Sequence, residues 1–207
     1  MKEIPKPWRE EMKKNAIVLL STLLILGFVA PPVLADNYSG WENIRPLLKD
    51  GKGDEFVRLI KDLPSDYFSD ETEFDAVQQA ITWVATHMTY VADIGEVWTS
   101  SDQMYTRLEG DCEDYAILLC ALLRFHTQGG IPAKRVWVVV GLVTSPGEGV
   151  IAGHAWVAYK MERGGTVYIE PQTGWIFRGN LPGYGGHMLN FNDQWVKGGG
   201  PYLAGPN

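Results

Sequence analysis

The sequence predicts an α+β fold in which one central, buried helix packs on an antiparallel β-sheet. Apolar residues surround the segment from Cys112 to His126 on every side, as in a helix that no face exposes to water. Runs rich in β-branched and apolar residues follow it at 135–143, 152–161 and 166–170. Helices therefore come first along the chain and strands second, an order typical of α+β domains.

Residues 1–35 have the features of an export signal. The basic pair Lys13-Lys14 precedes an apolar run over 16–30, and Pro31-Pro32 closes that run ahead of a small-residue exit at Ala35. A cleaved signal peptide is favoured, but an N-terminal membrane anchor stays open because the run, counted to Ala35, has about the length that spans a bilayer. With either outcome the basic flank stays in the cytoplasm, and the protein is expected to be extracytoplasmic, secreted or anchored by this segment.

Residues 36–207 have the length of one domain with a hydrophobic core of its own. They hold 13 basic and 22 acidic side chains, a net charge of −9. Such a body disfavours nucleic acid as a partner, and it leaves the N-terminal segment as the expected contact with a membrane. The expected core of the domain covers about 70–178, and a Gly-rich tail follows over 179–207.

Helices are expected ahead of the central one. Segments 41–49 and 55–63 are predicted to be short helices, and a longer helix is predicted to begin near Asp70 with Glu73 as its capping partner. Residues 91–110 have no clear period and are expected to be irregular. One face of the longer helix is expected to pack inward through its apolar positions, Phe74, Val77, Ile81, Val84 and Met88.

Turn residues divide the later segments. Gly129-Gly130 and Pro132 are predicted to end the central helix. Arg163-Gly164-Gly165 is predicted to form a hairpin turn into the strand at 166–170. Beyond residue 179, Gly and Pro dominate, and Phe191 and Trp195 are the strong apolar anchors.

The chain has two cysteines, and both lie in the central helix. Eight residues separate Cys112 from Cys120, about 12 Å along a helix axis, whereas a disulfide needs Cα atoms within about 7 Å. Cys120 is interpreted as a core residue. Cys112 opens the helix behind Asp111, a good N-cap, where free N–H groups and the helix dipole favour an anion. Because the flanking carboxylates raise a thiol pKa, a nucleophilic Cys112 needs a cationic partner.

His154 is the best candidate for that partner. It lies in a predicted strand beside Gly153, and Glu170 ends the next strand, about 5 Å away in a sheet. Glu170 would then orient His154, which would activate Cys112, while the N–H of Cys112 could bind an oxyanion. Taken singly, each residue also has a structural interpretation: a capped helix start, a histidine within a strand and a solvated strand end.

These segments together resemble the transglutaminase-like (papain-like) superfamily of cysteine hydrolases, in its bacterial and archaeal peptidase-like branch. The resemblance rests on Gly110–Ala116 (GDCEDYA), Gly153–Trp156 (GHAW), Ile169–Thr173 (IEPQT), Trp98–Ser100 (WTS) and Gly130–Ala133 (GIPA). It covers about 70–173 and implies a papain-like core with Cys112, His154 and Glu170 as the triad. The family usually has Asp at the third position. The resemblance also implies a cleft or oxyanion role for Trp98.

The expected function is that of an exported cysteine hydrolase, which cleaves peptide or amide bonds through a thioester acyl-enzyme. A protein or peptide is the expected substrate. Two alternatives stay open: a protein-glutamine acyl transferase (transglutaminase) and a non-catalytic binding module on the same fold. No cofactor or metal is expected, although calcium, which some family members bind, could use Glu113 and Asp114; helix capping explains at least Asp114 without an ion.

Overall fold

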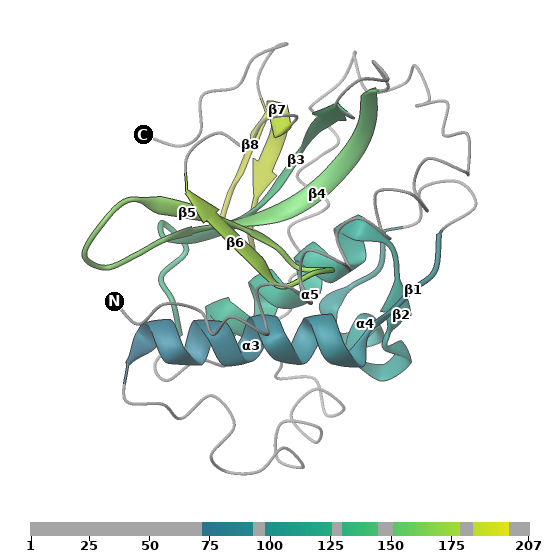
Figure 1. Ribbon diagram of the computed structural model, residues 1–207, viewed down its shortest axis with the longest axis horizontal. Coiled ribbons are helices and arrows are strands. Elements are labelled where there is room, and N and C mark those ends of the chain that lie inside the picture. The colour runs from purple at the N-terminus through teal and green to yellow at the C-terminus, as the bar shows by residue number, and fades with distance from the viewer. Residues whose placement is uncertain (1–71, 93–97, 126–129, 145–150, 179–183, 199–207) are drawn as a thin grey trace, which may run out of the picture.

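The computed structural model describes residues 72–92, 98–125, 130–144, 151–178 and 184–198, and Figure 1 shows helices on one side of a twisted sheet. The predicted leader and the two short helices at 41–49 and 55–63 lie outside the described residues. In the described part, no helix is both long enough and apolar enough to cross a bilayer.

Helix α3 (Glu73–His87) is the long helix that precedes the central one. Its predicted start near Asp70, with Glu73 as capping partner, is wrong: Thr72 is the N-cap, and its hydroxyl accepts the backbone N–H of Asp75 at 3.2 Å. The predicted inward face is confirmed from Val77 onward. Phe74, however, is 37 % exposed, because with this cap it falls in the first turn. Buried positions of α3 include Ala76, Val77, Ala80, Ile81 and Val84.

Regular structure replaces much of the segment that was expected to be irregular. Helix α4 (Ser101–Arg107) lies within it, and Leu108 ends that helix in the left-handed conformation, with a φ of 54°. Strands β1 (Thr89–Tyr90) and β2 (Glu109–Gly110) form a parallel pair. The pair fixes the backbone just ahead of α5, so the first residue of that helix has a defined position.

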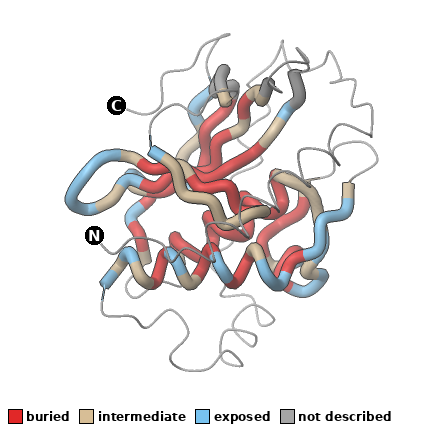
Figure 2. Tube along the Cα trace, in the orientation of Figure 1, coloured by how far each residue is buried: buried red, intermediate tan, exposed pale blue. Residues whose placement is uncertain are grey.

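Helix α5 (Cys112–Phe125) is the central helix, and its predicted burial is confirmed. Every residue from Glu113 to Arg124 is buried, and Figure 2 shows α5 as a continuous buried segment between α3 and the sheet. Gly130 follows the helix with a φ of +67°, a conformation that favours glycine. The helix thus carries the core of the domain and presents Cys112 at its N-terminal end.

Six antiparallel strands form the sheet in the order β6-β5-β4-β3-β7-β8. Strand β7 pairs with β3 and lies inside the sheet, so the sheet continues into the Gly-rich segment beyond residue 178. Glycine content concealed this strand. The strands are β3 (Val136–Thr144), β4 (Ile151–Lys160), β5 (Thr166–Glu170), β6 (Trp175–Arg178), β7 (Tyr184–Phe191) and β8 (Val196–Gly198).

The turn between β7 and β8 is attached to the core by polar side chains. Arg124 of α5 bonds both carboxylate oxygens of Asp193, at 2.6 and 2.8 Å, and also donates to the carbonyl of Ile131. The amide of Asn192 donates to the carbonyl oxygens of Ala133, ahead of β3, and Val136, its first residue, at 2.7 and 3.0 Å. The bonds of Asp193 and Asn192 connect residues 56 to 69 positions apart, so the C-terminal strands belong to the same folded unit as α5.

Candidate active site

Cys112 lies where the end of α5 meets strand β4. It is partly buried, and its thiol donates to Oε2 of Glu113 at 3.3 Å. The backbone N–H of Ala155 donates to the sulfur, so the thiol lies against β4 at the residue next to His154. Cys120 is fully buried, and both cysteines are free, as the helical spacing predicted.

The surroundings of Cys112 oppose a thiolate. Burial raises the pKa of the thiol well above its usual value, and Glu113 and Asp111 raise it further, while the N–H of Ala155 lowers it. Burial and the neighbouring Asp111 also raise the pKa of Glu113 to about 9. The prediction that flanking carboxylates raise the thiol pKa is therefore confirmed for these two residues. At neutral pH the thiol keeps its proton unless a base removes it.

The predicted contact between His154 and Glu170 is present. Nε2 of His154 on β4 lies 2.6 Å from Oε2 of Glu170, the last residue of β5, and the two side chains are 10 % and 7 % exposed. The antiparallel register Val157↔Ile169 brings the two residues to the same end of neighbouring strands. In this pairing, Nε2 carries the proton toward the carboxylate, which leaves Nδ1 to act as a base.

Tyr184 is a site residue that the sequence reasoning missed. Its hydroxyl donates to Oε2 of Glu170 at 3.0 Å, and its ring packs edge-on against His154 and Trp156, with centroids 5.8 and 5.3 Å apart. Burial, then Glu170 and Cys112, raise the pKa of the phenol, so it stays a hydrogen-bond donor. The available signal was an isolated tyrosine between glycines, at the start of β7. Tyr184 thus bonds one oxygen of the Glu170 carboxylate, and the backbone N–H of Gln172 reaches the other, Oε1, at 3.4 Å.

No hydrogen bond connects Cys112 and His154 among the contacts that the described residues make. The thiol is bonded to Glu113 instead, and the imidazole is bonded to Glu170. Both still belong to one site, because the N–H of Ala155 contacts the sulfur of Cys112 and the ring of Tyr184 packs on His154. Tyr184 is also close enough to Cys112 for the thiolate form to raise the pKa of the phenol. The structure thus places a thiol, whose pKa its surroundings raise, near a histidine–carboxylate pair.

Asp114 fastens the segment that carries Trp98. Its Oδ1 accepts the N–H of Thr99 at 3.0 Å, so this carboxylate holds that segment in place. The sequence had suggested only a capping role for Asp114 at the start of α5. A side chain at Gly110 would collide with Asp114, which explains the glycine ahead of Cys112. The indole of Trp98 stacks on Phe191 with centroids 5.8 Å apart. Trp98 therefore lies against β7, and its expected cleft role stays a prediction.

Among the described residues, the side chains of Asp111, Cys112 and Glu113 form a group that could hold a metal, with ligand atoms within 4.8 Å of one another. Asp114 is not part of this group. Calcium takes about six to eight oxygen ligands, and two carboxylates with a thiol fall short of that set. The calcium hypothesis for Glu113 and Asp114 therefore finds no support in this geometry.

Fold and site together define a cysteine-hydrolase-like protein, with a cysteine at the start of a buried helix and a histidine–carboxylate pair on the sheet. The sequence model of the transglutaminase-like superfamily matches residues 65–177, more than half of the chain. The protein belongs to this superfamily, as the sequence motifs predicted.

Other comparisons add little. A candidate cysteine protease from Cytophaga hutchinsonii, solved as a crystal structure, is 19 % identical to this chain, with a TM-score of 0.43. The match covers 68 % of this chain and 44 % of that one, so the chain spans less than half the length of that protein. No curated protein matches the chain.

Proposed function

We propose that the protein is a cysteine hydrolase of peptide or amide bonds, with Cys112 as nucleophile, His154 as base and Glu170 as the carboxylate that orients it. The observation that carries the proposal is the 2.6 Å contact between His154 and Glu170. The residue that follows His154, Ala155, donates its N–H to the sulfur of Cys112. The superfamily provides the class of reaction, and these contacts provide the assignment of the roles.

In the first half of the reaction, Nδ1 of His154 takes the thiol proton and Cys112 attacks the substrate carbonyl carbon. The carbonyl oxygen becomes an oxyanion, for which the backbone N–H of Cys112 is the proposed donor. The imidazolium then protonates the leaving amine as the C–N bond breaks, and a thioester remains. Glu170 stabilises the imidazolium throughout, and Tyr184 keeps the carboxylate in place.

In the second half, His154 takes a proton from water, and the hydroxide adds to the thioester. The C–S bond breaks, the acid product leaves, and the proton returns to Cys112. An amine in place of water would give acyl transfer. Hydrolysis is proposed first, because water needs no binding site of its own, whereas transfer requires that an amine be bound beside the thioester.

A non-catalytic module on the same fold is the second candidate, and one observation favours it. The thiol donates to Glu113 and not to His154, and its pKa is raised. In this alternative, the carboxylates hold Cys112 as a permanently protonated side chain, and the site serves only to bind.

A proteome digest distinguishes the three functions. The full-length protein and its Cys112→Ala variant are each incubated with a denatured proteome and a biotinylated primary amine, and new N-termini and biotinylated glutamines are identified by mass spectrometry. New N-termini that need Cys112 support hydrolysis, and biotin on glutamine supports transfer. Identical spectra from the two proteins would eliminate both reactions and leave the binding module.

Export is a separate part of the proposal. Its support is the basic–apolar–small-residue order of residues 1–35. Fractionation of cells that produce the full chain tests it: the protein is expected outside the cytoplasm, and replacement of Lys13 and Lys14 with Glu should reduce its translocation. Recovery of both versions in the cytoplasm would contradict export.

A further inference from the structure

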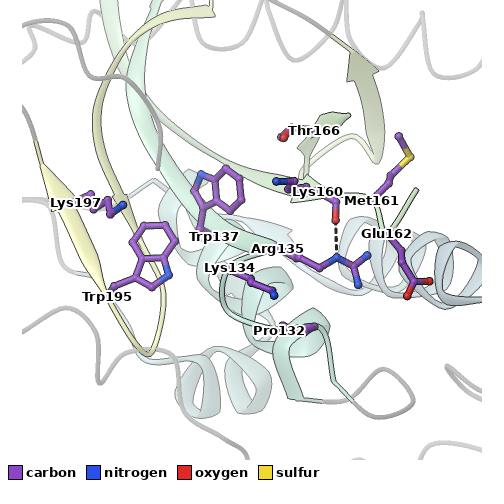
Figure 3. Close-up of a pocket in the computed structure, with 10 residues that line it drawn as sticks. All are labelled: Pro132, Lys134, Arg135, Trp137, Lys160, Met161, Glu162, Thr166, Trp195 and Lys197. Carbon is purple, nitrogen blue, oxygen red and sulfur yellow. Dashed lines mark hydrogen bonds between the residues drawn. The ribbon is translucent and has the colours of Figure 1, made fainter. Parts of the chain in front are cut away.

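Lysines are unevenly distributed in this domain. Residues 72–198 contain three lysines, Lys134, Lys160 and Lys197, and all three line one cavity of about 820 Å³. The cavity lies between the start of β3, the end of β4 and strand β8 (Figure 3). A volume of this size is typical of ligand sites. Three positive charges thus meet in one hollow of a chain whose net charge is −7.

The charge of this cavity is not neutralised by its neighbours. Arg135 also lines it, but its guanidinium bonds the carboxylate of Glu73 at 2.8 Å. Within the described part of the chain, no carboxylate forms an ion pair with any of the three lysines. Glu162 is the one acidic residue among those that line the cavity. The lining therefore has an excess of positive charge, which favours an anionic ligand.

Two tryptophans form the wall at the other end of the cavity. Trp137 and Trp195 lie side by side, with ring centroids 6.0 Å apart, and Figure 3 shows them at the end opposite Met161 and Glu162. The indole N–H of Trp195 donates to the carbonyl of Ala133 at 3.3 Å, which holds the ring in place. Fixed aromatic surfaces beside cations suit a ligand with apolar and charged portions.

The cavity is distinct from the site around Cys112. Lys160 and His154 are six residues apart on β4, which is about 20 Å along a strand. His154 lies next to Ala155, whose N–H contacts the sulfur of Cys112, whereas Lys160 is the last residue of the strand. About six extended residues of a peptide would span this separation.

We propose that the cavity is an exosite that binds an acidic peptide segment. Two or more carboxylates would contact Lys134, Lys160 and Lys197, and the aliphatic portions of the segment would lie on Trp195, the more exposed of the two tryptophans. Lysines suit this role because an ammonium group is a flexible point charge that accepts carboxylates at varied positions. The identification of this segment as part of a substrate rests on the proposed function, but its binding does not require catalysis.

Fluorescence anisotropy with a labelled peptide tests the exosite. The probe is an eight-residue peptide with four glutamates, compared with the same peptide carrying four glutamines, each titrated with the full-length protein at low and moderate salt. The glutamate peptide is expected to bind at least about tenfold more tightly, with affinity that falls as salt rises. The Cys112→Ala variant should bind it equally well.

Matched variants separate the cavity from general charge. Lys134→Gln removes one charge from the lining, and Arg107→Gln removes one exposed charge on α4, away from the cavity. The lysine variant is expected to bind at least about tenfold more weakly, and the arginine variant within about twofold of the parent.

Three results would overturn the exosite: no binding, equal losses in both variants, or tighter binding of a single-stranded oligonucleotide of the same charge. Peptide binding with no proteolysis would refute the proposed function and keep the exosite. Proteolysis without peptide binding would support the proposed function and overturn the exosite.

Discussion

The ion pair between Arg124 and Asp193 gives the sharpest stability prediction. Asp193→Asn keeps the shape of the side chain and removes its charge, which leaves a guanidinium 7 % exposed without its anionic partner. Removal of one partner from a buried pair costs about 3–5 kcal/mol. Asp193 itself is 18 % exposed, and Arg124 keeps the carbonyl of Ile131, so the expected loss is about 2–4 kcal/mol.

Thermal unfolding followed by circular dichroism measures this loss. For a domain of this size, each kcal/mol lowers Tm by about 2–4 °C, so Asp193→Asn is expected to lower Tm by at least about 4 °C. Glu73→Gln is the comparison, because its pair with Arg135 is more exposed, at 32 % and 13 %, and it should cost less. A Tm unchanged in Asp193→Asn would refute the conclusion that the β7–β8 turn is fastened to α5.

Three other substitutions test the site and the end of α5. Tyr184→Phe removes the hydroxyl that donates to Glu170, so alkylation of Cys112 at pH 7 should slow by up to about tenfold. An unchanged rate would show that Tyr184 does not position Glu170. Glu113→Gln removes a carboxylate that raises the pKa of Cys112, so the pH profile of alkylation should move to lower pH, and an unchanged profile would contradict the electrostatics. Gly130→Ala puts a Cβ 2.5 Å from the carbonyl oxygen of Arg124, at a φ of +67°, and should lower the free energy of unfolding in urea by about 1–3 kcal/mol. Gly165→Ala is the control, because a Cβ there meets open space, and it should cost less than about 0.5 kcal/mol. Equal costs for the two variants would contradict the backbone strain at Gly130.

Sequence patterns predicted the elements that bury a continuous apolar surface. Helix α5 has apolar residues on all sides, strands β3 and β5 are rich in β-branched residues, and β4 is largely apolar, so their burial and order follow from local composition. The pair formed by His154 and Glu170 also followed, because antiparallel neighbours across a tight hairpin lie about one strand spacing apart.

What the sequence concealed depends on tertiary contacts. Strand β7 contains glycines and has weak β-propensity. It nevertheless pairs with β3, because the backbone N–H and C=O groups along that edge of β3 would otherwise have no strand partner. Tyr184 entered the site only through this pairing. The bond from Cys112 to Glu113 was also hidden, since adjacent residues in a first helical turn can orient their side chains in several ways.

The reactivity of Cys112 tests the central claim most directly. Burial and two carboxylates raise the thiol pKa, so only a base within reach can make it reactive at pH 7. Its rate of alkylation by iodoacetamide is measured by mass spectrometry in the full-length protein, with buried Cys120 as an internal control. We expect Cys112 to react faster than the same thiol in the unfolded chain, and at least about tenfold more slowly in His154→Ala. A folded rate no higher than the unfolded rate, and unaffected by His154→Ala, would contradict the assignment of Cys112 as a nucleophile.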